Sequence, residues 1–394
     1  MTLPRFIQIH TLHNYPGALL NRDDAGLAKR LPYGDAVRTR ISSQCLKRHW
    51  RVADDAFALA NLGVPMAVRS RGTLGLIRDR LIEQGVEATL AQAAAEGLRA
   101  AGLLDKGKDL KGKEALETGQ AVLLGRAEVD YLVQRCATLA EEHTDEKALK
   151  AAIATFLKDE KKNIEALRHG SGLESALFGR MVTSDVLASR DAAVYVAHAF
   201  TVHEAQVEND YFTVVDDLMR EAGEQGSAGI FDTELASGLY YGYVVIDVPQ
   251  LVANLEGISI KDWASAPVDK RELAGRVVMH LLHLIATVSP GAKRGSTAPF
   301  EWAKFMLVEA GDWQPRSLAG AFHNALGLNQ PALRKAAVQS LADELAKLDT
   351  AYGAPLARRY LAVDDVAVSG AQRLPLHALA EWAQTAVTQA AVEV

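Results

Sequence analysis

The sequence of 394 residues predicts an α+β fold with helical additions. Three observations support this class. Segments 6–12 and 239–248 have the alternating or β-branched and aromatic patterns of strands. An amphipathic helix pattern lies between these two segments in the chain, and a second amphipathic helix pattern follows segment 239–248. A block at 73–168 is rich in Ala, Leu, Glu and Lys at helical spacing, and we interpret it as an inserted helical subdomain.

The chain begins with a predicted strand at 6–12, FIQIHTL, followed by a segment without a sustained period. Asn14, Pro16, Gly17, Pro32 and Gly34 punctuate 13–39, which we therefore expect to be a long loop. Loops of this length within a domain are usually functional or disordered. This one carries several charged side chains, namely Arg22, Asp23, Asp24, Lys29 and Arg30.

Segment 40–51, RISSQCLKRHWR, is the most informative stretch of the chain. A serine at its start can cap a helix that begins near Gln44. Helical spacing places one polar and basic stripe on this helix, made of Gln44, Lys47, Arg48 and Arg51. The nearly opposite face carries Leu46, Trp50, Ala53 and Phe57.

Cations in the first turns of a helix oppose its dipole and cost about 0.3–1 kcal/mol each unless an anion lies there. Free N–H groups, serine hydroxyls and several cations at a helix start are what phosphate binding requires, and Arg38 and Arg40 arrive just before it. The sequence therefore points to a phosphate-binding helix. The alternative is a solvated basic face paired with acidic neighbours.

The charge is unevenly distributed along the chain. The net charge is −6, yet residues 22–51 hold eight Lys and Arg against three Asp and Glu, a local charge of +5. A basic patch on an acidic body suits a protein that holds a polyanion in one groove, and it also suits self-association of acidic against basic flanks. No apolar run of membrane-spanning length and no signal peptide are seen, so we expect a soluble, cytoplasmic protein. Cys45 and Cys136 lack metal-ligand spacing and are expected to be small buried or half-buried residues.

Further elements follow in the second half of the chain. A helical piece is expected at 192–203, a projecting hairpin with exposed aromatics at 207–229, and a strong strand at 239–248. Asp269 and Glu272 open a helix in the style of a capping box. A loop with Lys293 and Arg294 and a strand at 305–308 come next, and helices are expected at 316–326, 331–348 and 376–392. This order is compatible with a βαββαβ sheet of the RNA-recognition type with helical additions, although the usual aromatic signature of that fold is absent.

Six short motifs carry a resemblance to a known family. They are NRDD at 21–24, RISSQCLKRHWR at 40–51, GRMVTS at 179–184, DYFTVVDDL at 210–218, QGSAG at 225–229 and PGAKR at 290–294. In their order and spacing they resemble the backbone subunit of the type I-E CRISPR surveillance complex Cascade, the CasC family. The resemblance extends over most of the chain but is poor at 73–168.

The resemblance implies a hand-like subunit with a modified RNA-recognition-motif (ferredoxin-like) palm, an inserted helical fingers domain and a projecting thumb. The implied domains are 1–72, first part of the palm with the basic helix; 73–170, fingers; 171–238, wedge and thumb; and 239–394, second part of the palm with C-terminal helices. Such a subunit is not an enzyme and uses no cofactor. It forms a filament of copies along one CRISPR RNA, kinks the guide at regular intervals, and presents its bases to target DNA in antiviral defence beside other Cascade subunits.

The resemblance also implies which residues contact RNA. The backbone of the guide would be held by Arg22, Arg40, Ser42, Gln44, Lys47, Arg48 and Arg51, and in the later loop by Lys293 and Arg294. Met181 would be a wedge beside the kinked base. Tyr211, Phe212 and Thr213 would belong to the thumb, and Tyr211 stands where a tryptophan is expected in a close relative.

The main alternative is a metal-dependent ribonuclease that uses loop aspartates. Asp23 with Asp24, or Asp216 with Asp217, could bind Mg²⁺. Adjacent aspartates do not share a face of a strand or helix, however, and loop aspartates commonly serve as turn residues. His280 and His283, like His10 and His13, are expected to be packed or hydrogen-bonded. The catalytic motifs GxSxG, HExxH, Walker A and GxGxxG are absent, and a helical adaptor without nucleic acid would leave the basic stripe unexplained.

Overall fold

The computed structural model describes residues 3–103, 116–118, 121–159, 172–180, 190–215, 227–353 and 356–389, with the backbone alone at 212–215 and 227–231. The chain divides into two compact units. The first, which we call the sheet unit, comprises Met1–Leu59, Tyr195–Val248 and Arg271–Val394. The second, the helical unit, comprises Ala60–Val194 and Pro249–Lys270. The domain boundaries inferred from the resemblance stay predictions.

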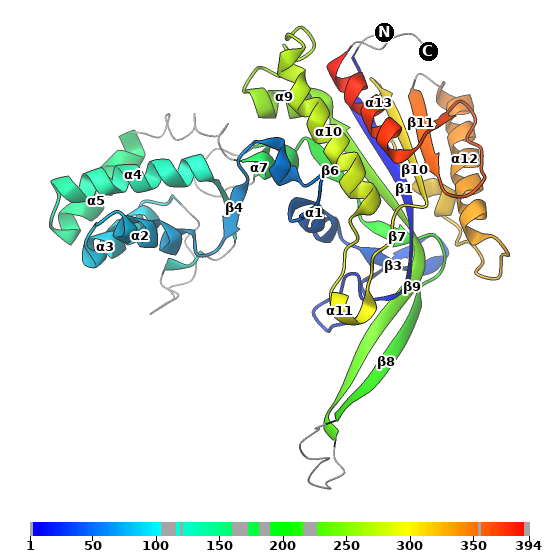
Figure 1. Ribbon diagram of the computed structural model, residues 1–394, viewed down its shortest axis with the longest axis horizontal. Coiled ribbons are helices and arrows are strands. Elements are labelled where there is room, and N and C mark those ends of the chain that lie inside the picture. Colours follow the sequence, from blue (N-terminus) through cyan, green and yellow to red (C-terminus); the bar gives the residue numbers. More distant parts are fainter. Residues whose placement is uncertain are drawn as a thin grey trace. The chain divides into compact units, whose positions relative to one another are not determined.

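A ten-stranded mixed sheet organises the sheet unit (Figure 1). Its main path runs β12-β11-β10-β1-β9-β7-β3-β2, while β6 and β8 also pair with β9. The strands are β1 (Phe6–Ala18), β2 (Arg30–Tyr33), β3 (Ala36–Ile41), β6 (Val194–Val196), β7 (Ala199–Thr201), β8 (Gln206–Val215), β9 (Ser227–Asp247), β10 (Phe305–Gly311), β11 (Ala357–Ala362) and β12 (Gln372–Arg373). β11 and β12 are parallel, whereas β1 is antiparallel to both of its neighbours.

The three strands predicted from the sequence are confirmed, and each lies in the middle of the sheet. In β1 both alternating sets of side chains are buried, because the sheet has covered faces on both sides. Ile9 faces Val244 of β9 on one side and Val308 of β10 on the other. β-branched side chains pack well in such a doubly covered sheet, which explains why these strands gave the strongest pattern.

Three other predictions were wrong. Segment 13–39 is not one long loop, because β1 continues to Ala18 and β2 and β3 form a hairpin within it. Segment 192–203 forms β6 and β7 instead of a helix, since pairing with β9 overrides its alanine content. At 316–326 the structure has only the short 3₁₀ helix η4 (Ala319–Phe322).

Helices cover the sheet and close its core. They are α1 (Ser43–Arg51), α10 (Asp269–Thr287), α12 (Leu333–Tyr352) and α13 (Leu376–Thr388), while the short helix α11 (Arg294–Thr297) has no buried residue. A cluster beneath α12 and η4 brings strand residues such as Leu12 and Phe305 against Phe322 and Leu341. A smaller cluster brings Tyr240 and Ile41 against Leu46, so that α1 rests on the sheet through its apolar side. The helices predicted at 331–348 and 376–392 correspond to α12 and α13.

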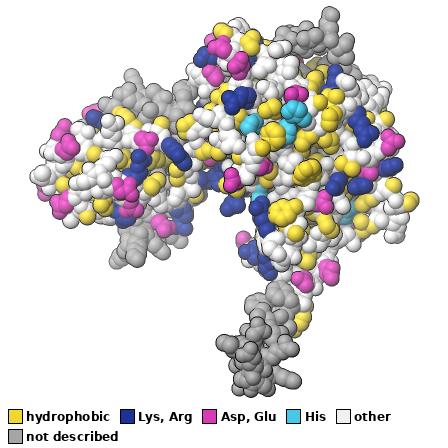
Figure 2. Space-filling model, viewed as in Figure 1, with side chains coloured by type: hydrophobic (Ala, Val, Ile, Leu, Met, Phe, Trp, Pro, Cys, Tyr) yellow, Lys and Arg dark blue, Asp and Glu magenta, His cyan; other side chains and the backbone are white. Residues whose placement is uncertain are grey.

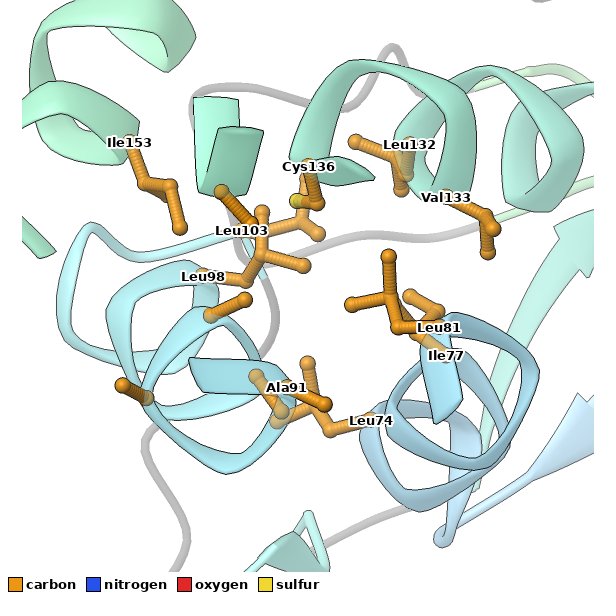
Figure 3. Packing of buried hydrophobic residues seen from close by; sticks show 14 of the residues in the cluster. Leu74, Ile77, Leu81, Ala91, Leu98, Leu103, Leu132, Val133, Cys136 and Ile153 are labelled. Atoms are coloured by element: carbon orange, nitrogen blue, oxygen red, sulfur yellow. The ribbon is translucent and has the colours of Figure 1, made fainter. Parts of the chain in front are cut away.

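The helical unit has its own hydrophobic core (Figure 3). Side chains of α2 (Thr73–Glu83), α3 (Ala88–Ala100), α4 (Arg126–Glu142) and α5 (Glu146–Asp159) converge in it. A two-stranded sheet of β4 (Ala67–Ser70) and β5 (Val122–Gly125) and the helices η1 (Leu59–Leu62), α7 (Leu173–Phe178) and α9 (Val248–Glu256) complete the elements described. Among the described residues, no helix is both long and apolar enough to cross a bilayer.

Candidate nucleic-acid interface

The start of α1 is tied into the protein by side-chain hydrogen bonds. Ser42 is the N-cap, and its Oγ accepts the N–H of Cys45 at 3.3 Å. The Ser42 N–H donates to Oδ1 of Asn21 at 2.8 Å, and the Ser43 N–H donates to Nδ1 of His198 at 3.0 Å. The expectation that these first-turn N–H groups are free for a phosphate was therefore wrong for Ser43 and Cys45. What α1 offers to a ligand is its side chains.

The predicted division of α1 into two faces is present, but over a shorter helix. α1 ends at Arg51 and is capped by Val52, so Ala53 and Phe57 lie beyond it. Trp50 is buried and Leu46 is half-buried against the sheet. The other side, which we call the basic stripe, presents exposed Gln44 and Arg48 with half-buried Lys47 and Arg51. Burial lowers the pKa of Lys47 below its usual value.

Positive charge is concentrated around the start of α1. The pKa of His198 lies below its ordinary value, first because of burial and then because of the charges of Arg40 and Lys29. Within the described part of the chain, no carboxylate lies at ion-pair distance from four of the predicted contacts, namely Arg22, Arg40, Arg48 and Arg294. By contrast, nearby Arg30 is paired with Glu234. Among the described residues, these four side chains are therefore not neutralised by acidic neighbours.

The loop 289–303, which contains α11, is a second basic segment. It forms a hydrogen bond with α1. The Gly291 N–H donates to Nε2 of His49 at 3.3 Å, and Nδ1 of His49 contacts the Cys45 carbonyl oxygen at 2.8 Å. Lys293 has a left-handed φ of 52° and its Nζ donates to Oγ1 of Thr233 at 2.6 Å. Figure 2 shows Lys and Arg side chains gathered in the neighbourhood of α11.

Three residues that arrange this surface were not found from the sequence. They are Asn21, His49 and His198, which hold the start of α1 and the loop 289–303. His49 stood within the informative segment, and its place among cations was a signal that could have been used. Nothing near Asn21 or His198 in the sequence marks them as partners of α1, because both contacts depend on the fold.

The predicted thumb residues lie on the hairpin of β8 and β9, which extends beyond the sheet as a two-stranded ribbon (Figure 1). Tyr211 is opposite Asp232 and its side chain is 64% exposed. Phe212 and Thr213 follow in β8, opposite Phe231 and Ile230, and the structure gives their backbone only. Met181, the predicted wedge, lies outside the described residues.

Of the aspartates of the alternative nuclease site, Asp23 has a role in a turn and two others are not described. Oδ1 of Asp23 accepts the N–H groups of Ala25 and Leu27, at 2.9 and 3.0 Å, which is the role of a turn residue. Asp216 and Asp217 lie outside the described residues. In the segments that the structure describes, no group of three or more His, Cys, Asp and Glu residues is placed to hold a metal ion.

The predicted structural histidines and cysteines are confirmed. His280 is buried and contacts the carbonyl oxygen of Phe57, and His283 contacts that of Met279. His10 is buried beside the Tyr241 hydroxyl, at 2.9 Å. Cys45 and Cys136 are free thiols, half-buried and buried respectively.

The fold and the basic surface were compared with known proteins. No curated protein matches the chain. One similar solved structure, titled "CRISPR RNA-guided surveillance complex, pre-nicking", superposes with a TM-score of 0.78 at 28% identity, covering 97% of this chain and 100% of that one. Another, titled "CRISPR RNA-guided surveillance complex", has a TM-score of 0.65 at 25% identity and covers 95% of this chain and 99% of that one. Residues 7–385 match a protein family, and the chain belongs to that family, the CT1975-like proteins.

Proposed function

We propose that this protein is a CRISPR RNA-binding backbone subunit of a Cascade surveillance complex, of type I-E. It assembles with CRISPR RNA, other copies of itself and other Cascade subunits. It is non-catalytic, polymerises along the guide, kinks it at regular intervals and leaves its bases free to pair with target DNA. Both similar structures belong to RNA-guided surveillance complexes and match almost the whole chain, which supports this role.

The topology supports a modified RNA-recognition palm. The sheet contains the neighbours β10-β1-β9-β7, all antiparallel, with α1 in the connection from β1 to β7 and α10 in that from β9 to β10. This strand order and these connections fit the split βαβ arrangement of a βαββαβ fold, which supports the proposed palm. In this proposal the hairpin of β8 and β9 belongs to the thumb within 171–238, and the helices within 73–170 form the fingers.

The observation that carries the proposal is the basic stripe of α1 beside the loop 289–303. Its exposed Arg48 has no carboxylate partner among the described residues. Near the start of the same helix, the pKa of His198 is lowered first by burial and then by the charges of Arg40 and Lys29. Lys, Arg and Gln side chains bind phosphates and sugars without reading sequence, which is what a carrier of any guide needs.

The proposal assigns roles to the individual residues. Contacts to the RNA backbone come from Arg22, Arg40, Gln44, Lys47, Arg48, Arg51, Lys293 and Arg294. Ser42 contributes mainly by capping α1, since its hydroxyl already accepts the Cys45 N–H. The contacts of the hairpin with the RNA come from Tyr211, Phe212 and Thr213, and Met181 is the wedge. Apolar wedges unstack a base step at a cost of a few kcal/mol and so fix where the strand is kinked.

The variant Arg48→Ala tests the proposal. Its matched control is Lys335→Ala, which removes one exposed positive charge from α12. Binding of several single-stranded RNAs of unrelated sequence is measured over a range of salt concentrations. Arg48→Ala should weaken all of them about equally and reduce the slope of log affinity against log salt by about 0.7, whereas Lys335→Ala should not. No binding by the wild-type chain, or a loss confined to particular sequences, would count against the proposal.

A further inference from the structure

The loop 289–303, which is hydrogen-bonded to α1 through His49, presents two large aromatic side chains to solvent. Phe300 is 67% exposed and Trp302 is 70% exposed. The Arg294 guanidinium lies over the Phe300 ring, 5.8 Å from its centroid. Exposed apolar surface beside charged side chains is typical of a contact site, and Phe300 lies in the same loop as Lys293 and Arg294.

The loop is held in place at several points. The Ala292 N–H donates to the Leu19 carbonyl oxygen at 2.9 Å, and the Glu301 N–H donates to Oγ of Ser289 at 2.8 Å. Gly291 packs so closely on Pro299 that a Cβ there would lie 2.5 Å from the proline Cγ. Phe300 is therefore displayed on a fixed segment, which reduces the ordering cost of binding.

The two aromatic residues differ in their surroundings. Trp302 lines an apolar groove of about 590 Å³ together with residues such as Val363 and Leu376, and nothing in the structure shows what covers that groove. Phe300 is not part of that lining, and its neighbour is a cation. An aromatic ring combined with Arg on a basic surface is the arrangement with which proteins bind single-stranded nucleic acids.

We propose that Phe300, with Arg294 over its ring, is a stacking site for one base of the bound RNA. This inference rests on the proposed function and adds to it a contact to a base, whereas α1 contacts the backbone. Stacking is compatible with a guide of any sequence because every base has a π face. The loop reaches α1 through the hydrogen bond between Gly291 and His49, so one RNA strand can engage both.

The test uses the full chain and a series of single-stranded RNAs of one sequence, each with 2-aminopurine at a different position. The fluorescence of this base is quenched when it stacks. With the wild-type chain, we expect additional quenching at one or more positions. Phe300→Leu should remove it and weaken binding about tenfold, while Phe300→Tyr should keep both. Trp313→Leu is the matched control, since Trp313 is 51% exposed and lies outside the loop.

The possible outcomes separate the inference from the proposed function. If the wild-type chain binds RNA but Phe300→Leu changes neither quenching nor affinity, the stacking site is overturned and the proposed function stands. If the wild-type chain binds no RNA, both the stacking site and the proposed function are contradicted. Quenching seen only with single-stranded DNA of the same sequence, or loss of self-association in sedimentation velocity with unchanged RNA affinity, would also overturn the stacking site. Unchanged thermal unfolding of the variants shows that the fold is intact.

Discussion

At the scale of single residues, Ser42 has a structural role that can be separated from RNA binding. Its hydroxyl caps α1 by accepting the Cys45 N–H. Ser42→Ala should lower the free energy of unfolding by about 0.5–2 kcal/mol, whereas Ser42→Asn, which can also cap, should lose less. Urea unfolding measures both. An alanine variant that is as stable as wild type but binds RNA more weakly would instead mean that the hydroxyl serves the ligand directly.

His13 gives a prediction about pH. Burial lowers its pKa to about 4 from 6.5, although backbone hydrogen bonds to Ala286 and Ile285 partly oppose the shift. A histidine whose pKa is depressed by folding takes up its proton more readily when unfolded, so stability should fall as pH drops from about 6.5 towards 4. Unfolding curves at pH 7, 6 and 5 check this. His13→Gln should show a smaller loss over the same range, and an identical loss would exclude His13 as a contributor.

At this scale the sequence identified the cationic and exposed residues of α1 but not the residues that hold them. Arg48 and Gln44 could be placed on one face because helical spacing is a local property of the chain. The bonds from Ser42 to Asn21 and from Ser43 to His198 join residues far apart in sequence, so no local pattern signals them.

At the scale of elements, the sheet contains a buried ionic network that joins two strands to α12. Both oxygens of Glu309 on β10 are bound by Arg316, at 2.5 and 2.9 Å, and one is also bound by Nε of Arg358 on β11 at 2.7 Å. Arg358 in turn binds both oxygens of Asp349 on α12. Glu309 is fully buried. Without Glu309, Arg316 would have no carboxylate partner in this network and the buried Arg358 would keep only Asp349, so the buried charges would be poorly compensated.

Glu309→Ala should therefore lower the free energy of unfolding by about 3–5 kcal/mol. The matched control is Asp364→Ala, which breaks the partly exposed pair with Arg334 and should cost less than about 1 kcal/mol. Denaturant unfolding of the two variants makes the comparison. Similar small losses for both would mean that the network around Glu309 contributes little to the pairing of these elements.

The same scale explains which elements could be predicted. The central strands were found because burial on both faces selects continuous apolar and β-branched runs, as in 239–248. β2 and β3 were missed because each is short and partly exposed, which leaves too few residues for a period to emerge. β6 and β7, of three residues each, exist because β9 pairs with them, and that pairing is invisible to local propensity.

At the scale of the whole molecule, charge is separated along the chain. Residues 22–51 carry +5 while the remainder carries −11, and α1 of that segment is hydrogen-bonded through His49 to a second basic loop. A basic surface on an acidic body concentrates a polyanion in one place and disfavours nonspecific attachment elsewhere. The prediction of a nucleic-acid partner thus depended on the distribution of charge, since the net charge of −6 would by itself argue against such a partner.

A chain that polymerises along a guide should bind RNA in proportion to its length. Doubling the length of a single-stranded RNA should roughly double the number of bound copies, because in the proposed function each copy contacts the RNA backbone without regard to sequence. Mass photometry of complexes on RNAs of graded length measures this number. Arg48→Ala should require more protein to reach the same occupancy, while the final number of copies stays the same, since the site size is set by the fold. A single bound copy at every RNA length would contradict polymerisation while leaving RNA binding itself intact.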